Sequence, residues 1–125
     1  MVINSVNQLD VFSLAKELRI RSWEIYKSLN WQDKKICGDQ FIRSVDSIGA
    51  NIAEGFGRFH YLDKNKFYYN GRGSLLEAKF WIGVLREREF ILDNEVTILN
   101  NIIEKTLLKL NALIKSQYLK KNPNN

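Results

Sequence analysis

Two carboxylates are the side chains of this sequence whose positions suggest chemistry. Glu54 lies near the end of a helical run, where the helix dipole disfavours a negative charge. Glu77 has no cation three or four residues away on either side. Paired carboxylates can act as general acid and general base, but in a helical protein they more often anchor structure, satisfied by arginine, asparagine or backbone donors. We therefore predict a structural polar network on two neighbouring helices, with a lined ligand site as the alternative. The predicted network consists of Asn51, Glu54, Ser74 and Glu77.

Other catalytic and metal-binding arrangements lack the residues that they need. The single histidine, His60, falls in an expected loop, which excludes the Glu-x-x-His pairs of a di-iron bundle and a Ser-His-Asp triad. The single cysteine, Cys37, excludes a disulfide framework and a cysteine-based zinc site. We expect a protein that is not an enzyme and that uses no cofactor and no metal.

The composition is that of one globular domain. Of the 125 residues, 45% are hydrophobic and 26% are charged, and the one proline stands at position 123. Long helices can therefore run uninterrupted up to that point. No apolar run approaches the roughly 20 residues of a membrane span, and the first residues lack the apolar core of a signal peptide. We expect a cytoplasmic protein with no membrane partner.

Four segments show the three- and four-residue spacing of apolar side chains that is typical of helices. They cover residues 10–29, 33–56, 63–89 and 93–118. Four long helices with short connections pack as an antiparallel up-down-up-down four-helix bundle, so the predicted class is all-α. We expect the bundle to occupy residues 1–121 and residues 122–125 to form a disordered tail.

Local signals predict how these helices begin, end and pack. Asp10 and Asp63 are suitable N-caps, and Gly55 and Gly57 can adopt the left-handed conformation that ends a helix. The apolar stripe of the third helix has small side chains in its middle, which predicts that the backbone of another helix approaches closely there. The members of this stripe are Phe67, Gly71, Ser74, Ala78, Trp81 and Leu85.

Most of the net positive charge lies in one quarter of the chain. The formal net charge is +5, and residues 58–88 carry seven cations against three carboxylates. Such a surplus can neutralise phosphates without reading base sequence, and nothing in the sequence resembles a helix-turn-helix or a zinc finger. The predicted nucleic-acid-binding residues are Arg58, Lys64, Lys66, Arg72, Arg86 and Arg88.

Several aromatic side chains fall outside the predicted apolar stripes. A bundle of this size cannot bury them all, and exposed apolar patches of this kind usually mark interfaces. We therefore expect a homo-oligomer. The residues concerned are Trp23, Trp31, Phe59, Tyr61, Tyr68, Phe80 and Phe90.

Two motifs resemble those of a known family. The runs from Gln40 to Ser44, from Ser47 to Gly55 and from Gly73 to Glu77 resemble the four-helix-bundle proteins encoded by intervening sequences in bacterial 23S rRNA genes. The accessory protein of diversity-generating retroelements has a similar pattern. The resemblance implies an antiparallel four-helix bundle, a ring of five subunits and a binding role without known chemistry. The implied partners are other copies of the chain and RNA, DNA or a nucleic-acid enzyme such as a reverse transcriptase. A purely protein-binding or structural module is the alternative.

Overall fold

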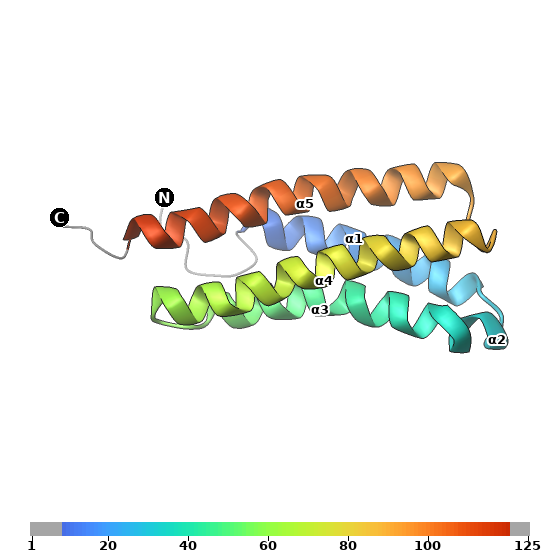
Figure 1. The fold of residues 1–125 in the computed structure, drawn as a ribbon, viewed down its shortest axis with the longest axis horizontal. Helices are drawn as coiled ribbons and strands as arrows, with labels where there is room; N and C mark the ends of the chain where they lie inside the picture. Colours follow the sequence, from blue (N-terminus) through green and yellow to red (C-terminus); the bar gives the residue numbers. More distant parts are fainter. Residues whose placement is uncertain (1–8, 121–125) are drawn as a thin grey trace.

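The chain folds into four long helical segments joined by short connections (Figure 1). The computed structural model describes residues 9–120. α2, a π-helical turn and α3 follow one another without a break and form the second segment. The elements are α1 (Asp10–Ser28), α2 (Trp31–Asp33), the π-helical turn (Lys34–Gly38), α3 (Asp39–Phe56), α4 (Tyr61–Glu87) and α5 (Asp93–Lys120). The predicted all-α four-helix bundle is confirmed, whereas the predicted tail lies outside the described residues.

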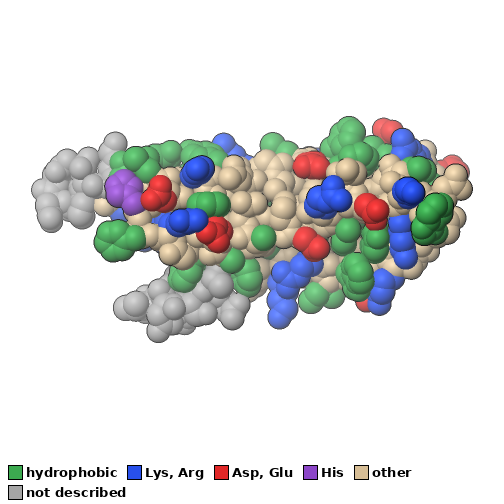
Figure 2. Space-filling model, turned by 90° about the horizontal axis from the view of Figure 1, so that it is seen from below, with side chains coloured by type: hydrophobic (Ala, Val, Ile, Leu, Met, Phe, Trp, Pro, Cys, Tyr) green, Lys and Arg blue, Asp and Glu red, His purple; other side chains and the backbone are tan. Residues whose placement is uncertain are grey.

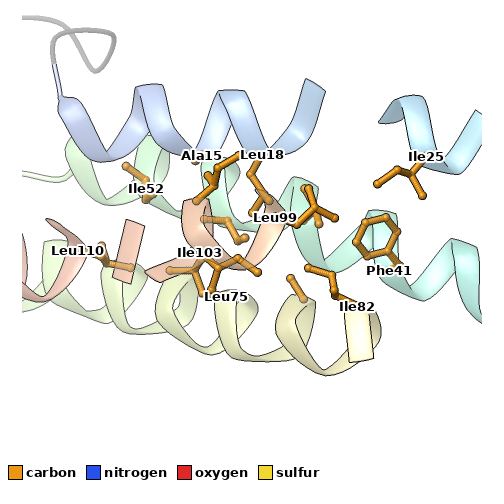
Figure 3. Close-up of a cluster of buried hydrophobic side chains, with 14 of the residues drawn as sticks. Ala15, Leu18, Ile25, Phe41, Ile52, Leu75, Ile82, Leu99, Ile103 and Leu110 are labelled. Carbon is orange, nitrogen blue, oxygen red and sulfur yellow. The ribbon is translucent and has the colours of Figure 1, made fainter. Parts of the chain in front are cut away.

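The four segments form a ring in which each packs against two neighbours. α3 contacts α1 and α4, and α5 contacts α4 and α1, so α1 and α4 lie diagonally opposite each other. Figure 1 shows successive segments running in opposite directions along the long axis of the molecule. Hydrophobic side chains from all four segments meet between them (Figure 3), and removal of this apolar surface from water is the main force that holds the bundle together.

The stripes predicted for the first, second and fourth helices supply most of this core. Their largest members have almost no exposed surface, as expected for apolar side chains at heptad-like spacing. They include Leu18, Phe41, Ile48, Ile52, Leu99, Ile103 and Leu110.

The buried face of α4 differs from the predicted one. Phe67, Ser74 and Trp81 are only half-buried, at the edge of the core. The prediction was wrong at these positions because apolar and small side chains repeat on adjacent faces of α4, and packing against α3 and α5 selects between the faces. The residues that face the core are Tyr68, Gly71, Leu75, Ala78, Ile82 and Leu85.

The glycines at the end of α3 do not act as the sequence predicted. Among the described residues no glycine has a positive φ, and Gly57, at the C-cap of α3, has a φ of −75°. Gly55 is instead a packing position, because a Cβ there would lie 2.6 Å from the ring of Tyr68. The close approach of another backbone that was predicted near Gly71 is looser than at Gly55. A Cβ at Gly71 would lie 3.6 Å from the Ile48 carbonyl oxygen, which is an ordinary van der Waals contact.

The two predicted aspartate N-caps are also wrong. α1 begins after Leu9, with Asp10 in its first turn. α4 begins after His60, whose Nδ1 accepts a hydrogen bond from the Leu62 N–H at 3.2 Å. A side-chain cap does occur before α2, where the side-chain oxygen of Asn30 accepts a bond from the Asp33 N–H at 2.8 Å.

The π-helical turn was not predicted. Its ring closes when the Asp39 N–H bonds to the Lys34 carbonyl oxygen, five residues back. Gly38 packs tightly at this point, because a Cβ there would lie 2.9 Å from Leu29 Cδ1. Cys37, within the turn, and Phe41, just after it, are both buried. The extra residue in the turn therefore keeps the apolar side chains on both sides of it facing the core.

Candidate functional site

The two carboxylates that the sequence singled out are both exposed and both have local partners. Glu54 forms an ion pair with Arg58, one turn further along, with Oε1 and Nη2 2.5 Å apart. Glu77 accepts a hydrogen bond from the indole Nε1–H of Trp81 at 3.2 Å. The four-residue spacing between Glu54 and Arg58 is the sequence signal for this pair.

A hydroxyl pair joins α3 to α4 near the middle of both helices. The Ser47 hydroxyl donates to the Ser74 hydroxyl at 2.5 Å, and Ser74 donates to the Asn70 carbonyl oxygen at 3.1 Å. The side-chain amide of Asn51 donates to the Ser47 carbonyl oxygen at 2.8 Å. Asn51 and Ser74 are therefore both linked to Ser47, a residue that the prediction left out.

The predicted network does not form as a whole within one subunit. No hydrogen bond in residues 9–120 connects Glu54 or Glu77 to the Ser47–Ser74 pair. Both carboxylates face solvent, so within the subunit neither carries the cost of an isolated buried charge. A role for them between subunits remains a prediction.

Three cations of α4 lie along its contact with α5. Lys79 forms an ion pair with Glu104 (2.9 Å), and Arg86 forms one with Asp93 (3.2 Å). Arg72 stacks over the Tyr69 ring and donates to a neutral side chain of α5, Asn111, at 3.1 Å. These exposed contacts each contribute at most about 1 kcal/mol, but they turn the three side chains towards α5.

The remaining predicted phosphate-binding residues lie at the two ends of α4. Arg58, Lys64 and Lys66 are at one end and Arg88 is at the other. Lys64 and Arg86 are 22 positions apart, which corresponds to about 33 Å along the helix. The six cations therefore do not converge on one patch, and Figure 2 shows acidic and basic side chains interspersed over the face that it presents.

Lys64 is the most constrained of these cations. Its ammonium donates to the Phe56 carbonyl oxygen at 2.8 Å, at the C-terminal end of α3, where a cation suits the helix dipole. Burial lowers the pKa of Lys64 below its usual value, and the nearby charge of Lys120 lowers it further. Lys66 and Arg88 are exposed, and neither forms an ion pair within the described residues.

An apolar seam runs along the side of α4 that faces away from the core. Its large side chains are 38–60% exposed, and they repeat every three, four or seven residues, as in a coiled coil. A Cβ at either of its two glycines would have no heavy atom within 4 Å. We call this surface the outer seam of α4, and its residues are Leu62, Tyr69, Gly73, Leu76, Phe80 and Gly83.

The predicted surplus of aromatic surface is found in part. Trp23, Trp31, Phe59 and Phe80 are exposed, and Tyr61 and Phe90 are half-buried. Tyr68 was placed in this set wrongly, because its ring is almost completely buried against Gly55.

Residues 9–120 contain neither a cluster of metal ligands nor a membrane-spanning helix. No three residues among the histidines, cysteines and carboxylates of this part of the chain lie together as a metal site would require. No helix in the same range is both long enough and apolar enough to cross a membrane.

Comparison with known proteins identifies the family of this chain. Residues 7–112 match the 23S rRNA-intervening sequence protein family. The chain belongs to this family. It is also similar to a crystal structure of a protein with unknown function from the S23 ribosomal protein family of Bacteroides thetaiotaomicron, with 26% sequence identity and a TM-score of 0.78 over 84% of this chain and 98% of the other. No match is found among curated proteins.

The family match covers α1 to α4 and the first two-thirds of α5. The motifs that carried the resemblance, on α3 and α4, both lie within it, including the Ser47–Ser74 contact. The last turns of α5, from Leu113 to Lys120, lie beyond it.

Proposed function

We propose that the protein is a non-enzymatic scaffold that assembles with other copies of itself, in the cytoplasm, and presents its cations to nucleic acid. The outer seam of α4 is the observation that supports assembly. Phe80 is 60% exposed and Leu76 is 54% exposed, and contiguous apolar side chains on one helix face usually mark an interface. Gly73 and Gly83 leave open space beside them into which side chains of a neighbouring helix can pack.

A ring of five copies, as the resemblance to the family implies, needs two different surfaces on each subunit. The outer seam of α4 supplies one. α1, on the diagonally opposite side of the bundle, supplies a candidate for the other, because Ile20 and Trp23 are about half exposed there. We propose that the seam of one subunit packs on α1 of the next.

Nucleic acid is the partner that the charge supports. Lys66 and Arg88 are exposed cations without an ion pair in the described residues, and a ring would present five copies of each. Several weak phosphate contacts in one assembly gain affinity through avidity. The contacts should be sequence-tolerant and salt-sensitive, because phosphate neutralisation releases counterions.

A purely protein-binding scaffold is the second candidate. The observation that favours it is the pairing of Lys79 with Glu104 and of Arg86 with Asp93. These two cations of α4 are already bound to carboxylates and are less available to bind phosphates. In that case the net charge serves solubility.

Light scattering with two matched variants tests the assembly. The wild-type mass should be about five times the subunit mass of 14.7 kDa. Phe80→Glu, in the seam, should reduce this mass, whereas Leu108→Glu, at a 72% exposed position on α5, should not. A wild-type monomer at micromolar concentration, or equal effects of the two substitutions, would contradict the proposed interface.

A gel-shift titration tests the partner. Duplex DNA, single-stranded DNA and structured RNA are each titrated at about 50 mM salt, where phosphate contacts are strong. A shift that is lost at about 200 mM salt supports the nucleic-acid scaffold. The absence of any shift would favour the protein-binding scaffold instead.

A further inference from the structure

α3 ends, α4 begins and α5 ends at the same end of the bundle (Figure 1). Side chains from these three helix ends line a pocket there, together with Leu9. Its volume is about 500 Å³, within the range of sites that hold small organic ligands. Its apolar wall comes from Phe56 on α3 and Leu113 on α5, and its polar side comes from α4 and α5. The pocket is separate from the outer seam of α4, and Lys64 is the one predicted nucleic-acid-binding cation that lines it.

The charged residues of 9–120 that line this pocket are all cations. Lys64 and Lys120 both contribute to its wall, and no carboxylate of this range does. The two ammonium groups lie close enough for the charge of Lys120 to lower the pKa of Lys64, in addition to the effect of burial. Lys64 is fixed in this position by its bonds to the carbonyl oxygens of Phe56 and Gly55, at 2.8 and 3.5 Å. An anion between the two lysines would relieve their repulsion, and the third N–H of the Lys64 ammonium remains to bind it.

Two polar side chains on the pocket wall are more than nine-tenths buried. Tyr68 is 1% exposed and Gln117 is 6% exposed, and both line the pocket. The Tyr68 hydroxyl has no hydrogen-bond partner within residues 9–120, and the Gln117 amide nitrogen reaches only the Ser116 hydroxyl, at 3.4 Å. Both groups can donate hydrogen bonds, so they suit a ligand that accepts them.

We propose that this pocket binds a small amphipathic carboxylate. The carboxylate group would lie between Lys64 and Lys120 and accept bonds from Tyr68 and Gln117, while a compact apolar body would pack on Phe56 and Leu113. The α5 side of the pocket lies beyond residue 112, where the match to the family ends. The proposed site goes beyond the scaffold function and requires neither nucleic acid nor assembly.

Titration calorimetry of the full chain with octanoate tests the proposal. Octanoate carries the carboxylate and an apolar body, octanol carries the body alone, and inorganic phosphate carries charge alone. We expect sub-millimolar binding of octanoate and at least about tenfold weaker binding of the other two, because hydrogen bonds to charged groups contribute more than neutral ones. The absence of octanoate binding, or equal binding of octanol or phosphate, would overturn the proposal.

Matched variants locate the site. Lys120→Ala should weaken octanoate binding about tenfold, whereas Lys115→Ala, an exposed cation on the same helix that does not line the pocket, should change it less than twofold. Tyr68→Phe should also weaken binding, by removing one donor. Equal affinities of the Lys120→Ala and Lys115→Ala proteins, with melting temperatures unchanged from the wild type, would place octanoate elsewhere and overturn the assignment.

Discussion

Gly55 on α3 lies against the ring of Tyr68 on α4. A Cβ at position 55 would lie 2.6 Å from Tyr68 Cε1 and 2.9 Å from the Lys64 carbonyl oxygen, distances that real Cβ atoms do not show. The absence of a side chain at Gly55 is therefore what allows Tyr68 to turn inwards and to lie 99% buried at the end of the core. This one contact fixes the register of α3 against α4 and also shapes one side of the pocket.

Gly55→Ala should destabilise the fold by about 1–3 kcal/mol, because the added methyl group must displace the Tyr68 ring or the α4 backbone. Gly57→Ala is the matched control. Gly57 has a φ of −75°, which alanine adopts freely, and the nearest atom to a Cβ there is a carbonyl oxygen at 3.6 Å. Guanidinium unfolding curves measure both effects. Equal stability of the two variants would show that the Gly55–Tyr68 contact does not constrain the helices.

Glu54→Ala and Glu77→Ala should each change the stability of the subunit by less than about 0.5 kcal/mol. Glu54 loses only an exposed ion pair to Arg58, and Glu77 loses only an exposed bond from Trp81. Buried carboxylates would instead give losses of about 3–5 kcal/mol on removal of a partner. Unfolding curves and mass should be measured together. A fall in mass without a fall in subunit stability would place the two carboxylates between subunits.

Helix positions and most of the core could be predicted from the sequence because they depend on local periodicity. The stripe of α3 from Phe41 to Ile52 is buried as predicted, since every third or fourth residue is apolar and no competing face exists. On α4 two faces carry apolar groups at heptad spacing. Whether Phe67 or Tyr68 turns into the core then depends on Gly55, which faces α4 from α3. This contact joins two helices, so the periodicity of α4 alone does not predict it.

The candidate site was predictable only where its contacts are local. The pair of Glu54 and Arg58 could have been found from its four-residue spacing. The pair of Lys79 and Glu104 could not, because the two residues are 25 positions apart and meet only through the register of α4 against α5. The pocket is unpredictable for the same reason, since three helix ends form it.

Tyr68 should make the fold sensitive to alkaline pH. Burial raises the pKa of its hydroxyl from 10.0 to about 12, so the unfolded chain releases this proton near pH 10 while the folded chain keeps it. The contribution of Tyr68 to stability is complete below pH 10 and falls by about 2–3 kcal/mol as pH rises from 10 to 12. Tyr68→Phe removes this titration. Unfolding at several pH values should show a steeper alkaline loss for the wild type, and parallel curves would contradict the burial of this hydroxyl.

Glu89→Gly should stabilise the protein by up to about 1 kcal/mol. Glu89 has a φ of 63°, a left-handed conformation that costs a residue with a Cβ more than it costs glycine. The N–H groups of Glu89 and Phe90 bond to the carbonyl oxygens of Arg86 and Leu85, at 3.0 and 2.8 Å, which is the Schellman arrangement that usually places glycine here. Glu87→Gly, at the last residue of α4, should destabilise by up to about 1 kcal/mol, the cost of glycine within a helix. A rise in melting temperature for the first variant and a fall for the second would agree with this assignment, and two falls would refute it.

Lys66 and Lys79 should differ in their contribution to any binding of nucleic acid. Both are exposed cations of α4, but Lys79 is paired with Glu104 at 2.9 Å and Lys66 has no ion pair within the described residues. Each phosphate that a cation neutralises adds about 0.7 to the slope of log affinity against log salt for single strands and about 0.9 for duplex DNA. If Lys66 neutralises one phosphate, Lys66→Ala should therefore reduce the slope of log affinity against log salt by about 0.7 to 0.9. Lys79→Ala should leave this slope nearly unchanged. Equal reductions would mean that the α4–α5 ion pair opens on binding, and no reduction by either would place the phosphates away from α4.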